Sequence, residues 1–246
     1  MPPDTADAST LAVDQVSVHF GGVAALSGVT LRAEAGMVTG LIGPNGAGKT
    51  TLFNVITGLQ RPNGGSVSLD GMDVTRMRPY RRARLGMART FQRLELFSTL
   101  SAADNVRVGL EASGRGVASS TAVDLLTRVG VEEEAAAPVS ALPTGSARLV
   151  ELARALSTEP KVLLLDEPFS GLDEHESAVL GRLLTSLAEE GRAVLLVEHD
   201  IDLVMQICSV VHVLDFGQVI ASGPPDDIRR NPAVQEAYLG RAKDAG

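Results

Sequence analysis

The sequence is short of three features that would each indicate a particular class of protein. Its one cysteine, Cys208, lies in an apolar helical run, cannot form an internal disulfide and is expected to be a small core residue. No apolar run approaches the ~20 residues that span a bilayer, and residues 1–10 are polar and acidic, unlike a signal peptide. The net charge of −8 argues against a general nucleic-acid binder. We therefore expect a soluble chain in a reducing compartment, with no nucleic-acid partner.

What the chain does have is a glycine-rich segment, 43–50, that fits the pattern G-x-x-x-x-G-K-[ST] at every fixed position. Its glycines let backbone N–H groups converge on a polyphosphate, Lys49 can reach the β- and γ-phosphates, and the Thr50 hydroxyl can hold Mg²⁺. Residues 37–42 are typical of a buried strand, and apolar residues at helical spacing follow the loop. This arrangement predicts a nucleoside triphosphate site. Its expected residues are Gly43, Pro44, Asn45, Gly46, Ala47, Gly48, Lys49, Thr50 and Thr51.

The hydrophobic pattern changes along the chain from strands to helices and back to strands. Residues 11–70 are β-rich around the loop, whereas residues 90–158 carry helical patterns and an Ala/Ser/Gly-rich connection near 112–122. From Lys161 onward, short apolar runs alternate with helical segments, which is typical of a parallel sheet buried on both faces. We therefore expect a helical lobe inserted into an α/β core. The expected later strands are 162–165, 193–197 and 210–214, with a hairpin at 216–221.

Two strand ends bring acidic residues and a histidine to the same predicted edge of the sheet. An apolar run leads into Asp166 and Glu167, at the carboxyl end where ligands bind in open α/β sheets. We expect Asp166 to hold Mg²⁺ through water and Glu167 to polarise the attacking water as a general base. The next strand leads to His199, which can hydrogen-bond a γ-phosphate. On the residues alone two alternatives stay open: an acidic pair can cap a helix, and a histidine at a strand end is more often structural.

The order and spacing of these motifs resemble the ATP-binding subunit of an ABC transporter over nearly the whole chain. The resemblance implies an α/β fold: a P-loop NTPase core of the ABC ATPase type, with an inserted helical subdomain and an N-terminal antiparallel β subdomain. Within an ABC ATPase domain spanning 11–240, the core would comprise 11–89 and 159–223 and the helical subdomain about 90–158. A disordered tail at 1–10 and a C-terminal segment at 224–240 would complete the chain.

The resemblance also implies a role for each matching residue. Phe20 would lie against adenine, and Gln92 would link the nucleotide to the helical lobe. Glu167 would be the catalytic glutamate and His199 the switch histidine. The loop that touches the opposite subunit would be Ser170, Gly171, Leu172 and Asp173. ATP and Mg²⁺ are the implied ligands; the catalytic residues would be Glu167, His199 and Gln92, and the Mg²⁺ residues Thr50, Gln92 and Asp166.

A narrower resemblance is to the branched-chain amino acid importer branch of that family. It is carried by 89–92, by Leu96-Phe97, by Asn105-Val106 and by the ending, 223–240. It implies a head-to-tail dimer with a second, different ATPase subunit, two permease subunits and an extracytoplasmic solute-binding protein. The permease would hold the chain at the cytoplasmic face of the membrane. Relatives in this branch carry urea or short amides, so the cargo stays open.

The signature loop departs from the family pattern. In the family this loop reads Leu-Ser-Gly-Gly-Gln or a close variant. In the family this loop completes the ATP site of the partner subunit, and Pro143 has neither the hydroxyl nor the N–H of the serine that it replaces. Losing one donor to a phosphate costs about 1.5–3 kcal/mol. We therefore predict that the partner's site works less well than this chain's own site; the alternative is that Thr144 and Gly145 fully compensate. The loop here is Leu142, Pro143, Thr144, Gly145 and Ser146.

Seven arginines gather within residues 76–93. A nucleic-acid patch is disfavoured because Tyr80 and Phe91 stand alone, without interleaved aromatic residues. Two interpretations stay open: a solvated face beside acidic neighbours, and a docking surface for a cytoplasmic helix of the permease. The cluster consists of Arg76, Arg78, Arg81, Arg82, Arg84, Arg89 and Arg93.

Two other functions are less consistent with the sequence than transport is. A soluble ABC ATPase of DNA repair or translation would normally show two cassettes or a long coiled coil, and the sequence shows neither. A nucleotide-dependent switch with little catalysis would lack Glu167 or His199, and both are present. The sequence therefore predicts the ATP-hydrolysing subunit of an importer for branched-chain or related amino acids.

Overall fold

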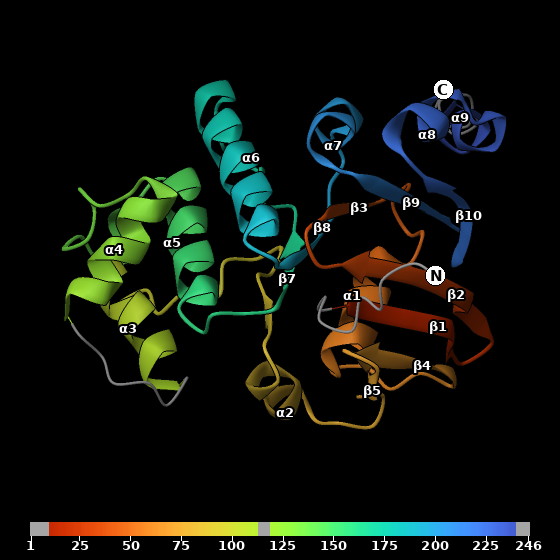
Figure 1. The fold of residues 1–246 in the computed structure, drawn as a ribbon, viewed down its shortest axis with the longest axis horizontal. Helices are drawn as coiled ribbons and strands as arrows, with labels where there is room; N and C mark the ends of the chain where they lie inside the picture. The colour runs from red at the N-terminus through yellow and green to blue at the C-terminus, as the bar shows by residue number, and fades with distance from the viewer. Residues whose placement is uncertain (1–9, 113–118, 240–246) are drawn as a thin grey trace, which may run out of the picture.

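The computed structural model describes residues 10–112 and 119–239 (Figure 1). A four-stranded antiparallel sheet has the order β2-β1-β4-β5, and a six-stranded sheet has the order β10-β9-β3-β8-β7-β6. In the second sheet the neighbouring strands are parallel except at the edge, where β10 runs antiparallel to β9. The strands are β1 (Thr10–Phe20), β2 (Val23–Glu34), β3 (Val38–Ile42), β4 (Gly64–Leu69), β5 (Met72–Asp73), β6 (Met87–Arg89), β7 (Val162–Asp166), β8 (Ala193–Val197), β9 (Val210–Asp215) and β10 (Gln218–Gly223).

The helices divide into a separate lobe and a layer on the parallel sheet. Helices α3, α4 and α5 pack on one another in the lobe, whereas α6 to α9 lie on one side of the six-stranded sheet and α1 lies on the other (Figure 1). The fold class predicted from the sequence is therefore confirmed. The helices are α1 (Lys49–Thr57), α2 (Pro79–Arg84), α3 (Ala102–Ala112), α4 (Ser119–Val129), α5 (Thr144–Leu156), α6 (Glu174–Glu189), α7 (Ile201–Ile207), α8 (Pro225–Arg230) and α9 (Pro232–Leu239), with a 3-10 turn η1 (Val139–Ala141).

The central strands explain why two cores form. Every residue of β3, β7 and β8 is buried, which is the pattern of parallel strands covered on both faces. Along β7 the side chains alternate: Leu163 and Leu165 join the core beneath α5 and α6, whereas Leu164 joins α1 and the antiparallel sheet. Cys208 is buried in the first of these cores, as expected. The sheet thus holds the carboxyl ends of β3, β7 and β8 side by side.

Three details concern the ends and connections of the chain. Strand β1 begins at Thr10, so that residue belongs to the sheet and not to the tail expected at 1–10; residues 1–9 lie outside the described part of the chain. Most of the predicted Ala/Ser/Gly-rich connection, 113–118, also lies outside it. Within residues 10–112 and 119–239, no helix has the length and apolarity needed to cross a membrane.

Candidate functional site

The glycine-rich loop joins the end of β3 to the start of α1. Gly43 has a φ of 153°, and a Cβ there would lie 2.0 Å from the carbonyl oxygen of Leu214, so only glycine fits. Lys49 Nζ donates to the carbonyl oxygens of Gly43, at 2.5 Å, and Pro44, at 3.0 Å. The N-cap residue of α1 is Gly48, which has no side chain to cap the helix. The start of α1, at the positive end of the helix dipole, is therefore a favourable place for an anion.

The loop forms one wall of a cleft of about 410 Å³. The opposite wall comes from the ends of β7 and β8 and from the segment after β6, so the fold unites residues that lie far apart in the sequence. Phe20, at the end of β1, is 52% exposed and lies outside the described set that lines the cleft. That set is Ala25, Asn45, Gly46, Ala47, Gly48, Lys49, Thr50, Thr51, Gln92, Asp166, Glu167, Val197 and His199.

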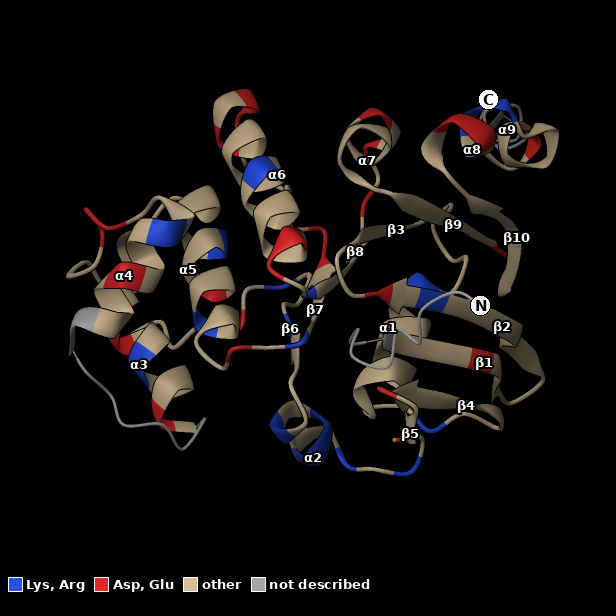
Figure 2. Cartoon of the chain, viewed as in Figure 1, with Lys and Arg blue, Asp and Glu red and all other residues tan. Residues whose placement is uncertain are grey.

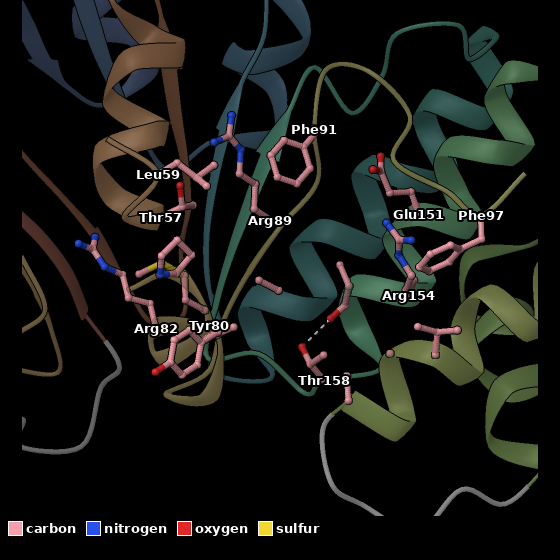
Figure 3. Close-up of a pocket in the computed structure, with 18 residues that line it drawn as sticks. Thr57, Leu59, Tyr80, Arg82, Arg89, Phe91, Phe97, Glu151, Arg154 and Thr158 are labelled. Atoms are coloured by element: carbon pink, nitrogen blue, oxygen red, sulfur yellow. Dashed lines mark hydrogen bonds between the residues drawn. The ribbon is translucent and has the colours of Figure 1, made fainter. Parts of the chain in front are cut away.

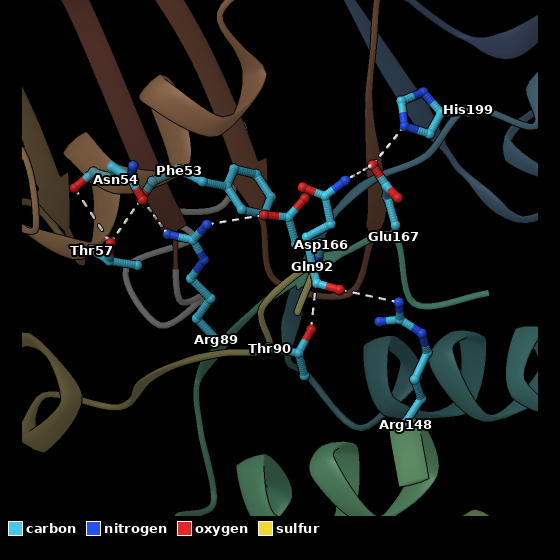
Figure 4. Close-up of polar contacts among 10 residues, drawn as sticks. All are labelled: Phe53, Asn54, Thr57, Arg89, Thr90, Gln92, Arg148, Asp166, Glu167 and His199. Atoms are coloured by element: carbon cyan, nitrogen blue, oxygen red, sulfur yellow. Dashed lines mark hydrogen bonds and ion pairs between the residues drawn. The ribbon is translucent and has the colours of Figure 1, made fainter. Parts of the chain in front are cut away.

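The Glu167 carboxylate is held from two sides by residues that the sequence analysis singled out (Figure 4). His199 Nε2 lies 2.6 Å from Glu167 Oε1, and Gln92 Nε2 donates to the same oxygen at 3.1 Å. Glu167 has a φ of +52°, which is uncommon for a residue with a side chain and is typical of functional sites. Its backbone N–H donates to the Val197 carbonyl at 2.9 Å, which ties this turn to β8. The turn thus fixes the direction of the carboxylate.

The neighbouring carboxylate, Asp166, is paired with an arginine that the sequence analysis did not place in the site. Arg89 Nη2 donates to Asp166 Oδ2 at 3.0 Å, with side chains only 6% and 4% exposed. Burial lowers the pKa of the Arg89 guanidinium, and the hydrogen bond to Asp166 partly offsets that effect. The sequence does contain one sign of this pairing: Arg89 directly follows the apolar pair Met87-Ala88. A charge at the end of a short buried strand needs a partner of opposite charge.

The segment after Gln92 is attached to α5 by polar side chains that the sequence analysis missed. Arg148 Nη2 donates to the Gln92 carbonyl at 3.1 Å, and the Glu95 N–H donates to Glu151 Oε1 at 3.2 Å. Arg154 donates to the Glu95 carbonyl. Burial raises the pKa of Glu151. The spacing of these residues, three apart along the helix, places them on one side of α5. That side connects the helical lobe directly to the residue that contacts Glu167.

The arginine cluster is not one solvated face, and that interpretation is wrong for two of its members. Arg82 is buried and donates to backbone carbonyls, among them those of Val55, at 2.7 Å, and Thr75, at 2.8 Å. Arg89 is buried against Asp166. The physical reason is that α1 ends with carbonyl groups that need donors, which Arg82 supplies. Four of the exposed members lie on α2 and on the segment before it, which Figure 2 shows as a basic surface, and the fifth follows β6; the five are Arg76, Arg78, Arg81, Arg84 and Arg93.

A second cavity, of about 510 Å³, opens between α2 and the helical lobe (Figure 3). We call it the apolar groove. Its walls carry exposed apolar side chains, among them Leu59, Tyr80 and Phe97, together with Phe91 and the stem of Arg89. Arg89 therefore lines the groove while its charged end contacts Asp166, which lines the cleft. The two cavities share a wall.

The signature loop and the 170–173 loop lie together, away from the cleft. The Thr144 side chain approaches Gly171, and Leu172 covers Gly145. Gly145 and Ser146 are buried, whereas Pro143 and Thr144 are exposed. Within the described residues, neither loop lines the cleft. Pro143 and Thr144, not Gly145, are therefore the residues at the start of α5 that are exposed.

Comparisons with known proteins agree with this geometry. Residues 26–170 match the family described as ABC transporter, and residues 218–244 match the branched-chain amino acid ATP-binding cassette transporter family. The chain is 38% identical to the high-affinity branched-chain amino acid transport ATP-binding protein BraF of Pseudomonas aeruginosa, over 94% of this chain and 98% of the relative. It is 37% identical, with the same coverage, to LivG of Escherichia coli.

Solved structures show the same fold. A nucleotide-free ATP-binding cassette from an ABC transporter superposes with a TM-score of 0.85 at 28% identity, covering 94% of this chain and 98% of the other. The ADP conformation of MJ1267, an ATP-binding cassette of an ABC transporter, gives a TM-score of 0.84 at 28% identity, covering 94% and 99%. Motifs, cleft and comparisons lead to one conclusion: the chain belongs to the ABC transporter family, as an ATP-hydrolysing subunit.

Proposed function

We propose that this chain uses Mg-ATP to drive the import of branched-chain or related amino acids through a separate permease, at the cytoplasmic face of the membrane. The observation that carries the proposal is the cleft itself, in which the phosphate loop faces Glu167, His199 and Gln92. The match of residues 218–244 and the names of the relatives support the amino-acid cargo. The proposed cargo and partners are therefore supported by the comparisons, whereas the proposed ATP hydrolysis is supported by the residues of the cleft.

The residues of the cleft fit a magnesium ion that is shared with a nucleotide. No group of three or more His, Cys, Asp or Glu residues in the described chain could hold a metal alone. Mg²⁺ instead prefers one or two protein oxygens, retained waters and substrate phosphates. Thr50 and Asp166, with Gln92 nearby, supply such a set. When bound, the ion would neutralise the charge that develops on the transferred phosphate.

Glu167, His199 and Gln92 form the catalytic group of the proposal. Glu167 accepts a proton from the attacking water, since a carboxylate at this position is a general base within reach of the phosphate loop. His199 and Gln92 both contact Oε1 and so orient the carboxylate before the reaction. Gln92 is also attached to α5 through Arg148, so its position depends on the helical lobe. The lobe can therefore respond to the state of the nucleotide.

A second ATPase subunit would complete each site. The 142–146 and 170–173 loops contact each other outside the cleft, with Thr144 exposed. In a head-to-tail dimer these loops would face the partner's phosphate loop, and the partner's loops would face this one. We propose a different but related chain as the partner, because a second copy of this chain would place Pro143 in both composite sites.

The apolar groove is the proposed docking site for the permease. Leu59, Tyr80 and Phe97 expose apolar surface to it, which fits the apolar face of an amphipathic helix. Exposed arginines of α2, such as Arg81 and Arg84, lie beside this groove and would attract acidic residues of that helix. A partner seated there would touch both the lobe and the wall of the nucleotide cleft.

The test is a pull-down of the tagged chain from native membranes in mild detergent, with partners identified by mass spectrometry. We expect a second ATPase, two permease subunits and a solute-binding protein that binds leucine, isoleucine or valine. Leu59→Glu, at a 55% exposed groove residue, should lose the permease, whereas Val123→Glu, at a 39% exposed residue of α4, should keep it. Recovery of soluble partners alone would contradict transport and favour a cytosolic ATPase or switch.

A further inference from the structure

Arg89 lies in the wall between the two cavities. It is the last residue of β6, whose parallel pairing with β7 sets Arg89 opposite Leu164. Its side chain lines the apolar groove, while its ion-pair partner, Asp166, lines the nucleotide cleft. Figure 3 shows it from the groove, and Figure 4 shows its polar contacts. A buried arginine at such a place needs strong partners, because an unpaired buried charge is costly.

The guanidinium joins two elements of the nucleotide site. Nη2 contacts Asp166 Oδ2 at 3.0 Å, and Nη1 donates to Asn54 Oδ1 at 2.7 Å. Asn54 belongs to α1, the helix that begins with Lys49 and Thr50. Because the fork of an arginine is planar and rigid, it fixes the distance and direction between its two partners. One side chain thus sets the Asp166 carboxylate relative to α1.

Two aromatic rings restrict the guanidinium further. Arg89 Cζ lies 5.4 Å from the centroid of the Phe53 ring and 4.7 Å from that of Phe91. Both distances are within the range of cation–π attraction. Phe53 is fully buried in α1, and Phe91 lines the groove. The contact with Asp166 uses Oδ2, so the second carboxylate oxygen would be the one to accept from a water of a bound Mg²⁺.

We propose that Arg89 is a positioning residue for Mg²⁺: it holds the Asp166 carboxylate in place relative to Thr50 and thereby raises the Mg²⁺ affinity of the nucleotide site. The positive charge of the guanidinium acts in the opposite sense, since it repels a cation. Orientation outweighs this repulsion because a single carboxylate that binds through water depends on its direction. The inference goes beyond transport and does not depend on a permease.

The experiment compares Arg89→Lys with the unchanged residue, both in a Glu167→Gln background that slows hydrolysis. Lysine keeps the charge, but its single ammonium group cannot bridge Asp166 and Asn54 as the fork does. Binding of a fluorescent ATP analogue is measured in EDTA and then during a Mg²⁺ titration. We expect unchanged affinity for the metal-free nucleotide and a Mg²⁺ midpoint raised by about tenfold, the value of one hydrogen bond to a charged group.

Two further variants keep the test decisive. Asn54→Ala removes the other anchor of the fork without touching the carboxylate, and should raise the Mg²⁺ midpoint by a smaller factor. Arg82→Lys is the matched control: Arg82 is also buried and lines the groove, but its described partners are backbone carbonyl oxygens. It should leave the midpoint unchanged. If Arg89→Lys does not fold, Asn54→Ala decides alone.

Three results would overturn the proposal. The first is a Mg²⁺ midpoint that stays constant or falls in Arg89→Lys, which would mean that charge repulsion outweighs orientation. The second is an equal loss of nucleotide affinity with and without Mg²⁺, which would indicate a structural defect. The third is an equal shift in Arg82→Lys, which would indicate that any buried arginine at the groove has this effect.

Discussion

Glu167 combines an uncommon backbone conformation with two hydrogen bonds to one carboxylate oxygen. A left-handed φ at a residue with a side chain costs about 1–3 kcal/mol, which the surrounding contacts must offset. The turn after β7 bears this strain where the carboxylate enters the cleft. His199 and Gln92 then hold the side chain from opposite elements, one after β8 and the other after β6. Geometry at this single residue therefore depends on three strand ends.

Replacing Glu167 by glutamine should lower ATP turnover by at least about 100-fold while nucleotide binding is kept. The amide has the same shape but cannot accept a proton from water. The measurement is the steady-state ATPase rate of the assembled ATPase pair, beside binding of a fluorescent ATP analogue. Glu189→Gln, at an exposed position of α6, is the matched control and should keep its rate. Equal rates in both variants would remove Glu167 from the mechanism.

Gly43→Ala should destabilise the chain by at least about 2 kcal/mol, because the new Cβ would clash with the Leu214 carbonyl and the φ is unsuited to alanine. Gly46→Ala is the comparison: Gly46 also has a positive φ, of 81°, but a Cβ there meets nothing within 4 Å. Gly46→Ala should lower the free energy of unfolding by only about 1 kcal/mol. Chemical denaturation measures both, and equal losses would refute the role of the clash.

At the scale of elements, His212 connects the six-stranded sheet to β2, the edge strand of the four-stranded sheet. From β9, its Nε2 lies 3.2 Å from the Arg32 carbonyl of β2, and its Nδ1 lies 2.8 Å from Ser222 Oγ of β10. A neutral ring with the proton on Nε2 satisfies both contacts, with the serine hydroxyl donating to Nδ1. Burial lowers the pKa of His212, so the folded state resists protonation.

The stability of the chain should therefore fall as the pH drops below about 6.5, the pKa of an unfolded histidine. In that range the unfolded state binds a proton that His212 in the folded state refuses, with a limiting slope of about 1.4 kcal/mol per pH unit. Above that pH the contribution is fully present. The check is the difference in unfolding free energy between wild type and His212→Gln from pH 5.5 to 8. A difference that does not change with pH would contradict this.

At the scale of the whole molecule, the attachment of Gln92 to α5 and the shared wall at Arg89 place both lobes in contact with the nucleotide site. A partner in the apolar groove would touch Phe91, next to Gln92 in the chain, as well as α5 residues such as Arg154. Groove and cleft are therefore linked through short contacts, of which the Arg89–Asp166 ion pair is buried. Such contacts have few alternative arrangements. This rigidity would suit a connection that transmits a change in nucleotide state from the cleft to the groove.

The proposed asymmetry between the two composite ATP sites would be a property of the assembled pair. With this chain's own site silenced by Glu167→Gln, the remaining turnover would come from the site that we propose borrows the 142–146 loop. Pro143→Ser should raise that turnover by about ten- to a hundredfold, because it restores a hydroxyl and an N–H.

Pro143 is also the N-cap residue of α5, so serine stabilises the helix by about 1 kcal/mol in any case. Pro143→Asp caps the helix equally well but sets a negative charge against the phosphate, and should bring no gain in turnover. Unchanged turnover in Pro143→Ser would favour full compensation by Thr144 and Gly145.

Much of the site was predictable because its motifs are local. The phosphate loop, the strand before Asp166 and Glu167, and the helix after the signature loop each follow from hydrophobic period and turn residues within a few positions. The position of His199 after a predicted strand favoured a structural role, and only the family resemblance indicated the switch histidine. The alternation of strands and helices predicted a helical lobe inserted into an α/β core, and the resemblance supplied the rest of the fold class. The domain boundaries and the roles of the site residues stay predictions.

Only the tertiary structure decided which residues far apart in the chain contact each other. Arg89 and Asp166 are 77 positions apart, and they meet because β6 and β7 are neighbours in the sheet. His212 meets Arg32 across 180 positions. Short-range patterns fix how each segment is built, because backbone geometry and side-chain period act over a few residues. Which buried charge finds which partner depends on the order of the strands, and no local pattern contains that order.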